Sequence, residues 1–150
     1  MKKFFFYDPK LLLYGFLIIF FASYGQTFFI ALFNDDIKNF YSLTDGEFGL
    51  VYAIATLSSS FILISFAKLI DHLDLRVYSF IITLGFLFAC LGMVLLINNI
   101  LYLFLIIFML RFFGQGAMDH AGGTTMARYF GNDKGKALSV ATLGGIIGVM

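Results

Sequence analysis

Four polar side chains in the stretch RFFGQGAMDH could do chemistry, although most of the residues around them are apolar. They are Arg111, Gln115, Asp119 and His120. A guanidinium binds anions, an amide donates and accepts hydrogen bonds, and a carboxylate or an imidazole can take up and release a proton. Burying such groups in hydrocarbon costs free energy unless each has a partner or a function. The stretch therefore predicts polar sites inside an apolar helix.

Helical geometry divides these residues into two groups. At about 100° per residue, Gln115 falls within about 40° of Arg111, which lies roughly 16 Å beyond the helix start at Ile100 and close to the bilayer midplane. Asp119 lies about 12 Å further along and about 80° round, and His120 is nearly opposite Arg111. We expect Arg111 and Gln115 to line a cavity, and Asp119 and His120 to be candidates for proton coupling.

A structural explanation of each residue stays open beside the functional one. Arg111 could be held by carbonyl groups or by a carboxylate and serve only packing specificity. Asp119 and His120 could form hydrogen bonds between helices, with no role in proton transfer.

The composition indicates what kind of element must hold these residues. Of the 150 residues, 61% are hydrophobic and 13% are charged, whereas soluble domains average about 50% and about 25%. A soluble core of this size could not bury so much apolar surface, so the chain is predicted to be an all-α integral membrane protein. Runs of about 20 apolar residues predict membrane spans. They cover residues 11–33, 48–70, 77–97 and 100–127, with an incomplete fifth span at 137–150.

Charges in the connections predict the orientation. Eight basic residues fall on the side of the N-terminus, and by the positive-inside rule that side is cytoplasmic: Lys2, Lys3, Lys10, Lys68, Arg76, Arg128, Lys134 and Lys136. The short connections predict that successive helices are antiparallel neighbours in a bundle. In the opposite connection, Thr44 and Glu47 have the spacing of a capping box for the second span. The abundance of Phe, Ile, Leu, Asn and Lys is typical of AT-rich genomes and indicates a bacterial inner (plasma) membrane.

No motif for catalysis, a metal, a cofactor or nucleic acid stands out. His72 and His120 have no companions at metal-ligand spacing, and Cys90 has no base nearby in sequence. The glycines of GQGAMDHAGG do not follow a strand, so a phosphate loop is not indicated. The basic residues form no groove for phosphates. We expect no enzyme activity, cofactor, metal or nucleic-acid partner; a membrane-embedded enzyme using Asp119 and His120 is the weakest alternative.

The turn after the second span carries a resemblance to a known family. AKLIDHLDLR resembles the signature that the major facilitator superfamily of secondary transporters carries between its second and third helices, glycine-x-leucine-x-aspartate followed by a glycine and basic residues. Leu69 and Asp71 match this signature. Ala67 and Asp74 replace its two glycines, and Arg76 alone remains of the closing basic pair.

The fourth span extends the resemblance. RFFGQGAM looks like the family's arginine-plus-glycine pattern on helix four, with Gly114 and Gly116 offset by one from the commonest spacing. ARYFGNDKGKALSVATLGGIIG resembles the passage from helix four, through a basic inner loop, into a glycine-rich helix five. Arg128 stands where many members carry an acid. The resemblance covers nearly the whole chain in order, spacing and topology.

This resemblance implies a twelve-helix carrier built of two six-helix halves that move about a central site. The chain would be an N-terminal fragment with helices one to four and part of five, lacking the C-terminal half of the same polypeptide. The resemblance implies that Asp71 and Arg76 latch the cytoplasmic side, and that Arg111, Gln115 and Gln26 face the central cavity. The expected function is ion-coupled transport of a small solute by alternating access, with H⁺ as the expected coupling ion. The charge of Arg111 suggests an anionic substrate.

A second hypothesis follows from the length of the chain as it stands. A small four-helix membrane protein could bind a partner or scaffold a complex. Such a protein should assemble stably when the 150 residues are produced alone, whereas a piece of a carrier should aggregate or be degraded. The sequence leaves the substrate, the coupling ion and the direction of transport open.

Overall fold

The computed structural model describes residues 8–95 and 97–150, and all the regular structure in them is helical, as predicted. The elements η1, η2 and η4 are 3₁₀ turns, and η3 is a π-helix. The elements in chain order are α2 (Pro9–Ala22), η1 (Ser23–Gly25), α3 (Thr27–Ala31), α4 (Asn34–Tyr41), α5 (Asp45–Phe66), η2 (Ala67–Asp71), α6 (Leu75–Val94), α7 (Ile100–Met109), η3 (Leu110–Met118), α8 (Asp119–Tyr129), η4 (Gly131–Asp133) and α9 (Lys134–Val149).

Four helical segments of the described chain are long and apolar enough to cross a bilayer, judged by length and composition. Each overlaps one of the four predicted full spans. Helix α9 lies where the incomplete fifth span was expected. Its 16 residues make it roughly 24 Å long. The four segments are Pro9–Ala31, Asp45–Asp71, Leu75–Val94 and Ile100–Tyr129.

The first span is not one continuous helix. Asp8 caps α2 by accepting a hydrogen bond from the backbone nitrogen of Leu11 at 3.0 Å, and Pro9 follows in the first turn, an arrangement typical of helix starts. After η1 the backbone of Gln26 is extended, with φ −84° and ψ 161°, before α3 resumes the helical path. Backbone of this kind is tolerated in a membrane only where it is covered by protein or lines a hydrated space.

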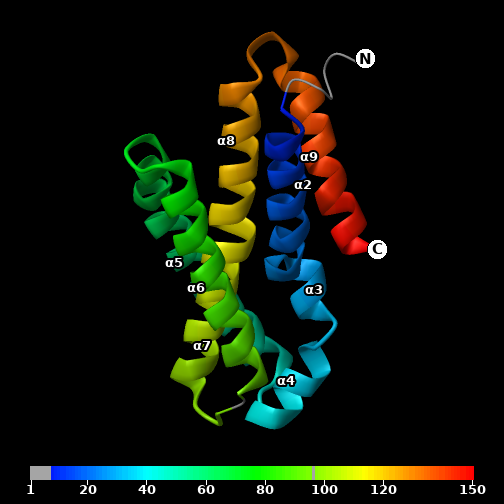
Figure 1. Cartoon of the computed structure of the whole chain (residues 1–150). Helices are drawn as coiled ribbons and strands as arrows, with labels where there is room; N and C mark the ends of the chain where they lie inside the picture. Colours follow the sequence, from blue (N-terminus) through cyan, green and yellow to red (C-terminus); the bar gives the residue numbers. More distant parts are fainter. Residues whose placement is uncertain (1–7, 96) are drawn as a thin grey trace.

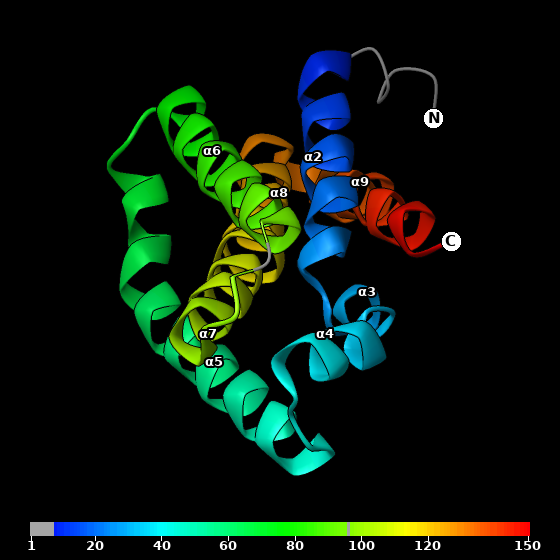
Figure 2. The same ribbon diagram turned by 90° about the horizontal axis from the view of Figure 1, so that it is seen from below.

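Successive spans run in opposite directions, as predicted for an antiparallel bundle (Figure 1). The fourth span, formed by α7, η3 and α8, lies in the middle. It contacts α5 and α6 on one side and α2 and α9 on the other, as Figure 2 shows from one end of the bundle. Residues of this central span therefore face the interior of the bundle from several directions, and Ile107, Ala117 and Ala121 are fully buried.

We name the two ends of the bundle by their charges. The basic end holds the start of α2, the turn between η2 and α6, and the connection from α8 to α9. The acidic end holds α4 and the start of α5 (Figure 1). Of the basic residues used to predict the orientation, Lys2 and Lys3 lie outside the described residues.

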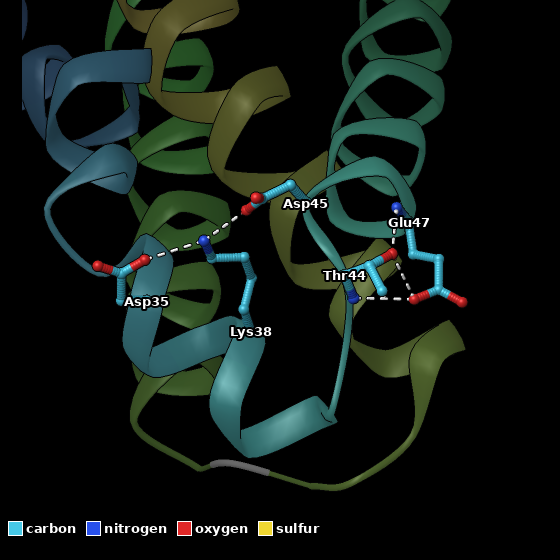
Figure 3. Close-up of polar contacts among 5 residues, drawn as sticks. All are labelled: Asp35, Lys38, Thr44, Asp45 and Glu47. Carbon is cyan, nitrogen blue, oxygen red and sulfur yellow. Dashed lines mark hydrogen bonds and ion pairs between the residues drawn. The ribbon is translucent and has the colours of Figure 1, made fainter.

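Local polar contacts order the acidic end (Figure 3). The Nζ atom of Lys38 lies 2.9 Å from a carboxylate oxygen of Asp35 and 2.6 Å from one of Asp45. The backbone nitrogen of Glu47 donates to Oγ1 of Thr44 at 3.3 Å, and the backbone nitrogen of Thr44 donates to the Glu47 carboxylate at 2.8 Å. These two bonds form the predicted capping box, which ties the start of α5 to the preceding turn.

The outward faces of the bundle are apolar. On α5 the exposed side chains include Leu57, Phe61 and Ile64, with exposed fractions of 60%, 72% and 64%. A water-soluble protein rarely exposes such a continuous apolar surface. Lipid chains can cover it, because every backbone hydrogen bond of a helix is satisfied within the helix. The chain is therefore a multi-pass integral membrane protein.

Candidate functional site

Two irregular segments of the backbone meet in the middle of the bundle. A methyl group on Gly25 would lie 2.5 Å from the carbonyl oxygen of Leu110, and one on Gly114 would lie 2.8 Å from the Cα atom of Gly25. The backbones of η1 and η3 are thus in direct contact at a point where neither has room for a side chain. This contact brings Gln26 and Thr27 against the fourth span.

Arg111 is buried at this crossing, with 9% of its surface exposed. Its Nη1 atom donates a hydrogen bond to Oγ1 of Thr27 at 3.0 Å. The guanidinium also lies over the ring of Tyr52, 5.4 Å from the ring centroid, a distance at which a cation is attracted to an aromatic face. The hydroxyl of Tyr52 donates to the same Thr27 oxygen at 2.9 Å. The first and second spans therefore hold the guanidinium of the fourth span through groups without charge.

Asp119 is joined to the same region through the neighbouring residue of the first span. The side-chain amide of Gln26 donates to a carboxylate oxygen of Asp119 at 3.4 Å. Since Gln26 and Thr27 are adjacent, the break in the first span connects Asp119 with Arg111. We call Gln26, Thr27, Tyr52, Arg111 and Asp119 the central cluster.

The geometry predicted for the fourth span assumed a regular α-helix, but Leu110–Met118 is a π-helix. A π-helix has more residues per turn, so angles counted at 100° per residue do not hold across it. Gln26, which the resemblance implied would face the central cavity with Arg111 and Gln115, is hydrogen-bonded to Asp119. Arg111 and Asp119, one from each of the two groups that helical geometry separated, belong to one cluster.

No hydrogen bond among the described residues joins Gln115 or His120 to the central cluster. Both are half-buried. His120 pairs with Thr124 on its own helix, with 3.4 Å between Nε2 and Oγ1. No hydrogen bond of the Gln115 side chain is found among the described residues.

At the basic end, Asp71 forms an ion pair with Arg128. Arg128 also donates to the carbonyl oxygen of Ile70 at 3.4 Å. The Arg76 side chain, expected to act with Asp71, forms no ion pair within the described part of the chain; its backbone nitrogen donates to Asp74 at 2.7 Å. Asp71, which the resemblance implied for the latch, thus pairs in this structure with a residue from the end of α8.

A cavity of about 780 Å³ lies between the first span, α4, α6 and η3, and Leu110 and Met118 of η3 form part of its wall. Its wall is formed mostly by aromatic and aliphatic side chains, among them Phe21, Tyr24, Phe29 and Phe86. No residue of the central cluster lines it. Its apolar wall offers little for the recognition of a polar solute, so the central cluster remains the candidate site.

Sequence reasoning missed Thr27 and Tyr52. A signal for Tyr52 was present, because a tyrosine hydroxyl inside an apolar span usually has a hydrogen-bond partner. Thr27 follows Gln26 directly but looks like an ordinary residue of a membrane helix. Its role depends on the extended backbone at Gln26, and Gly25 directly before it is the one turn residue at that point.

Comparison with known proteins assigns the chain to a family. A family model described as Major Facilitator Superfamily matches residues 6–150, which is nearly the entire sequence. No curated protein and no solved structure matches the chain. The members of this family are membrane transporters of small solutes. The order of the helices, the polar cluster in the middle of the bundle and the matched residues agree: this chain belongs to the major facilitator superfamily.

Proposed function

We propose that this chain is part of a carrier that moves a small solute by alternating access, with the central cluster as its substrate site. The observation that carries the proposal is the arrangement around Arg111, a buried cation of the fourth span held by neutral groups from the first and second spans. Membrane transporters place their sites near the midplane, where helices are interrupted and free backbone groups are covered. The break at Gln26 and the π-helix η3 are interruptions of this kind.

Asp119 is the proposed proton-coupling group, with His120 as a second candidate. The hydrogen bond from Gln26 links Asp119 to the residue next to the one that holds Arg111. Protonation of Asp119 would remove its negative charge and weaken this bond, because a charged acceptor binds a donor more strongly than a neutral one. Loading of the proton and occupation of the substrate site would thus be coupled through the first span.

The basic end is proposed to face the cytoplasm, in agreement with the positive-inside rule, and to act as a conformational latch. Asp71 would contribute through its pair with Arg128, and Arg76 would contribute in another conformation of the carrier. The proposed location is a bacterial inner membrane. The complete carrier would contain a C-terminal half of the same polypeptide, with Gln115 facing the space between the halves.

Uptake by the complete polypeptide in proteoliposomes tests this proposal. We expect accumulation of a solute driven by an inward proton gradient, and loss of that accumulation in Asp119→Asn. Exchange of internal for external solute, which needs no net proton movement, should survive in the same variant. Asp36→Asn, an exposed aspartate at the acidic end, is the matched control and should transport normally. Uptake by Asp119→Asn that still follows the proton gradient would remove Asp119 from coupling.

The scaffold hypothesis makes a different prediction. If the 150 residues act as a small membrane protein, they should remain monodisperse in detergent when produced alone. The family match favours the carrier. A stable isolated assembly, together with no solute uptake by the complete polypeptide, would favour the scaffold instead.

A further inference from the structure

The guanidinium of Arg111 is oriented but not neutralised. Thr27 accepts one hydrogen bond from Nη1, and Tyr52 covers one face of the group. Among residues 8–95 and 97–150, no carboxylate forms an ion pair with Arg111. Asp119, the acid of the central cluster, is hydrogen-bonded to Gln26. The positive charge therefore has no counter-ion in the described part of the chain.

One edge of the same guanidinium has no hydrogen-bond partner. The Nε atom is buried and makes no hydrogen bond with the described residues, and none is found for Nη2 among them. A buried charged donor without an acceptor is costly, and in native structures such a group indicates an ordered water, an ion or a ligand. Since Nη1 is held by Thr27, the free edge is the one formed by Nε and Nη2.

The geometry of this edge fits a carboxylate. Its two N–H groups point in parallel and can each donate to one carboxylate oxygen. Because the Tyr52 ring covers one face, a ligand that uses both donors would approach in the plane of the guanidinium. Arg111 is the one cation of the central cluster, so it can balance a single negative charge but not a dianion such as phosphate.

We propose that Arg111 binds the carboxylate of a small monocarboxylic acid through Nε and Nη2. Thr27 and Tyr52 are positioning residues, which hold the guanidinium so that this edge stays open. The inference rests on the proposed function of the central cluster as the substrate site. It adds the class of the substrate and the atoms that recognise it.

Thermal stability of the complete protein in lipid nanodiscs tests the binding site. The probes are acetate, hexanoate and benzoate, each compared with its own primary amide and with inorganic phosphate. At least one carboxylate should raise the melting temperature, whereas its amide and phosphate should not. Arg111→Lys should weaken the binding of that carboxylate by about tenfold or more, because lysine lacks the planar guanidinium with its two parallel N–H donors. Equal stabilisation of wild type and Arg111→Lys, stabilisation by phosphate instead, or no stabilisation by any carboxylate would overturn the proposal.

Milder variants keep the test informative if Arg111→Lys does not fold. Tyr52→Phe keeps the ring but removes the hydroxyl that reaches Thr27, and Thr27→Val removes the acceptor of Nη1. Each should weaken carboxylate binding several-fold, measured against the melting temperature of the same variant without ligand. Tyr129→Phe is the matched control, since Tyr129 is 54% exposed at the basic end, and it should bind as wild type. Unchanged carboxylate affinity in both Thr27→Val and Tyr52→Phe would show that these residues do not position the guanidinium.

Uptake of the same labelled carboxylates separates this inference from the proposed function. Carboxylate binding that depends on Arg111, without uptake of any solute, would support the binding site and contradict the carrier. Uptake of a neutral solute that depends on Arg111, without any carboxylate binding, would support the carrier and overturn the carboxylate site.

Discussion

Two arginines on the fourth span lie in opposite environments. Arg111 is buried in the middle of the bundle and contacts neutral groups, Thr27 and Tyr52. Arg128 lies at the basic end, where its side chain is 46% exposed and pairs with the carboxylate of Asp71. Arg128 thus has a carboxylate partner although water already solvates its charge, whereas the buried Arg111 has none among the described residues.

The two arginines also differ in the free energy that they contribute to folding. An exposed ion pair contributes about 0–1 kcal/mol, since water screens it and long side chains lose entropy when they are fixed. Placing an arginine at the bilayer midplane costs about 2.5–3.5 kcal/mol on insertion scales. A chain that keeps Arg111 at this cost without a carboxylate partner gains little stability from it. We therefore propose a binding role for Arg111 and, for Arg128, a contact that forms and breaks.

Replacing each arginine by alanine tests the comparison most strongly. In the proposed carrier, Arg111→Ala should lower uptake by about 100-fold or more, because hydrogen bonds to a charged group are lost in a buried site. Arg128→Ala should lower it by less than about 10-fold. Membrane insertion and expression, measured on the same samples, should stay near wild type for both. Similar losses for the two variants would contradict the difference drawn between them.

Gly25 probes the backbone crossing that places Thr27 against Arg111. Gly25→Ala should reduce uptake by about tenfold or more and lower the melting temperature by several degrees, because the new methyl group would overlap the carbonyl oxygen of Leu110. Gly46→Ala is the control, since no atom lies within 4 Å of the added methyl group. Wild-type uptake and melting temperature in Gly25→Ala would show that the two segments can separate without loss.

A charge exchange probes the basic end. Arg128→Asp alone should lower uptake by about 3-fold to 10-fold, because two carboxylates would then face each other. Adding Asp71→Arg to the same protein should restore uptake to within about 2-fold of wild type, since the pair is re-formed with its charges exchanged. A double variant that remains as impaired as the single one would show that Asp71 and Arg128 act independently.

The smallest effect is expected at the acidic end. The hydrogen bond to Asp45, and to a smaller extent the one to Asp35, raises the pKa of Lys38 above its ordinary value. Lys38 therefore stabilises the fold while it is protonated, and this contribution is lost as the pH rises through its pKa. Lys38→Gln should lower the melting temperature by only about 1 °C at pH 7, because the site is exposed. The difference from wild type should shrink at strongly alkaline pH. A difference that grows with pH would show that the ion pairs are not its cause.

The spans were predictable because hydrophobic length is a strong signal in membrane proteins. The capping box at Thr44 and Glu47 was predictable because its residues lie three apart and act locally. The partner of Asp71 was not, since Arg128 is 57 residues away in sequence and Arg76 is much closer. The central cluster was predicted only in part, because extended backbone at Gln26 and the π-helix η3 depend on how the spans pack.

The π-helix η3 has a consequence for insertions and deletions. A segment of this kind accommodates an additional residue in the helix, so removal of one residue within Leu110–Met118 could restore a regular α-helix without breaking the span. Such a deletion would turn α7 relative to α8 about the helix axis. It would change which side chains of this span face the first and second spans. A single-codon deletion in this segment would therefore move several side chains at once, whereas a substitution changes only one.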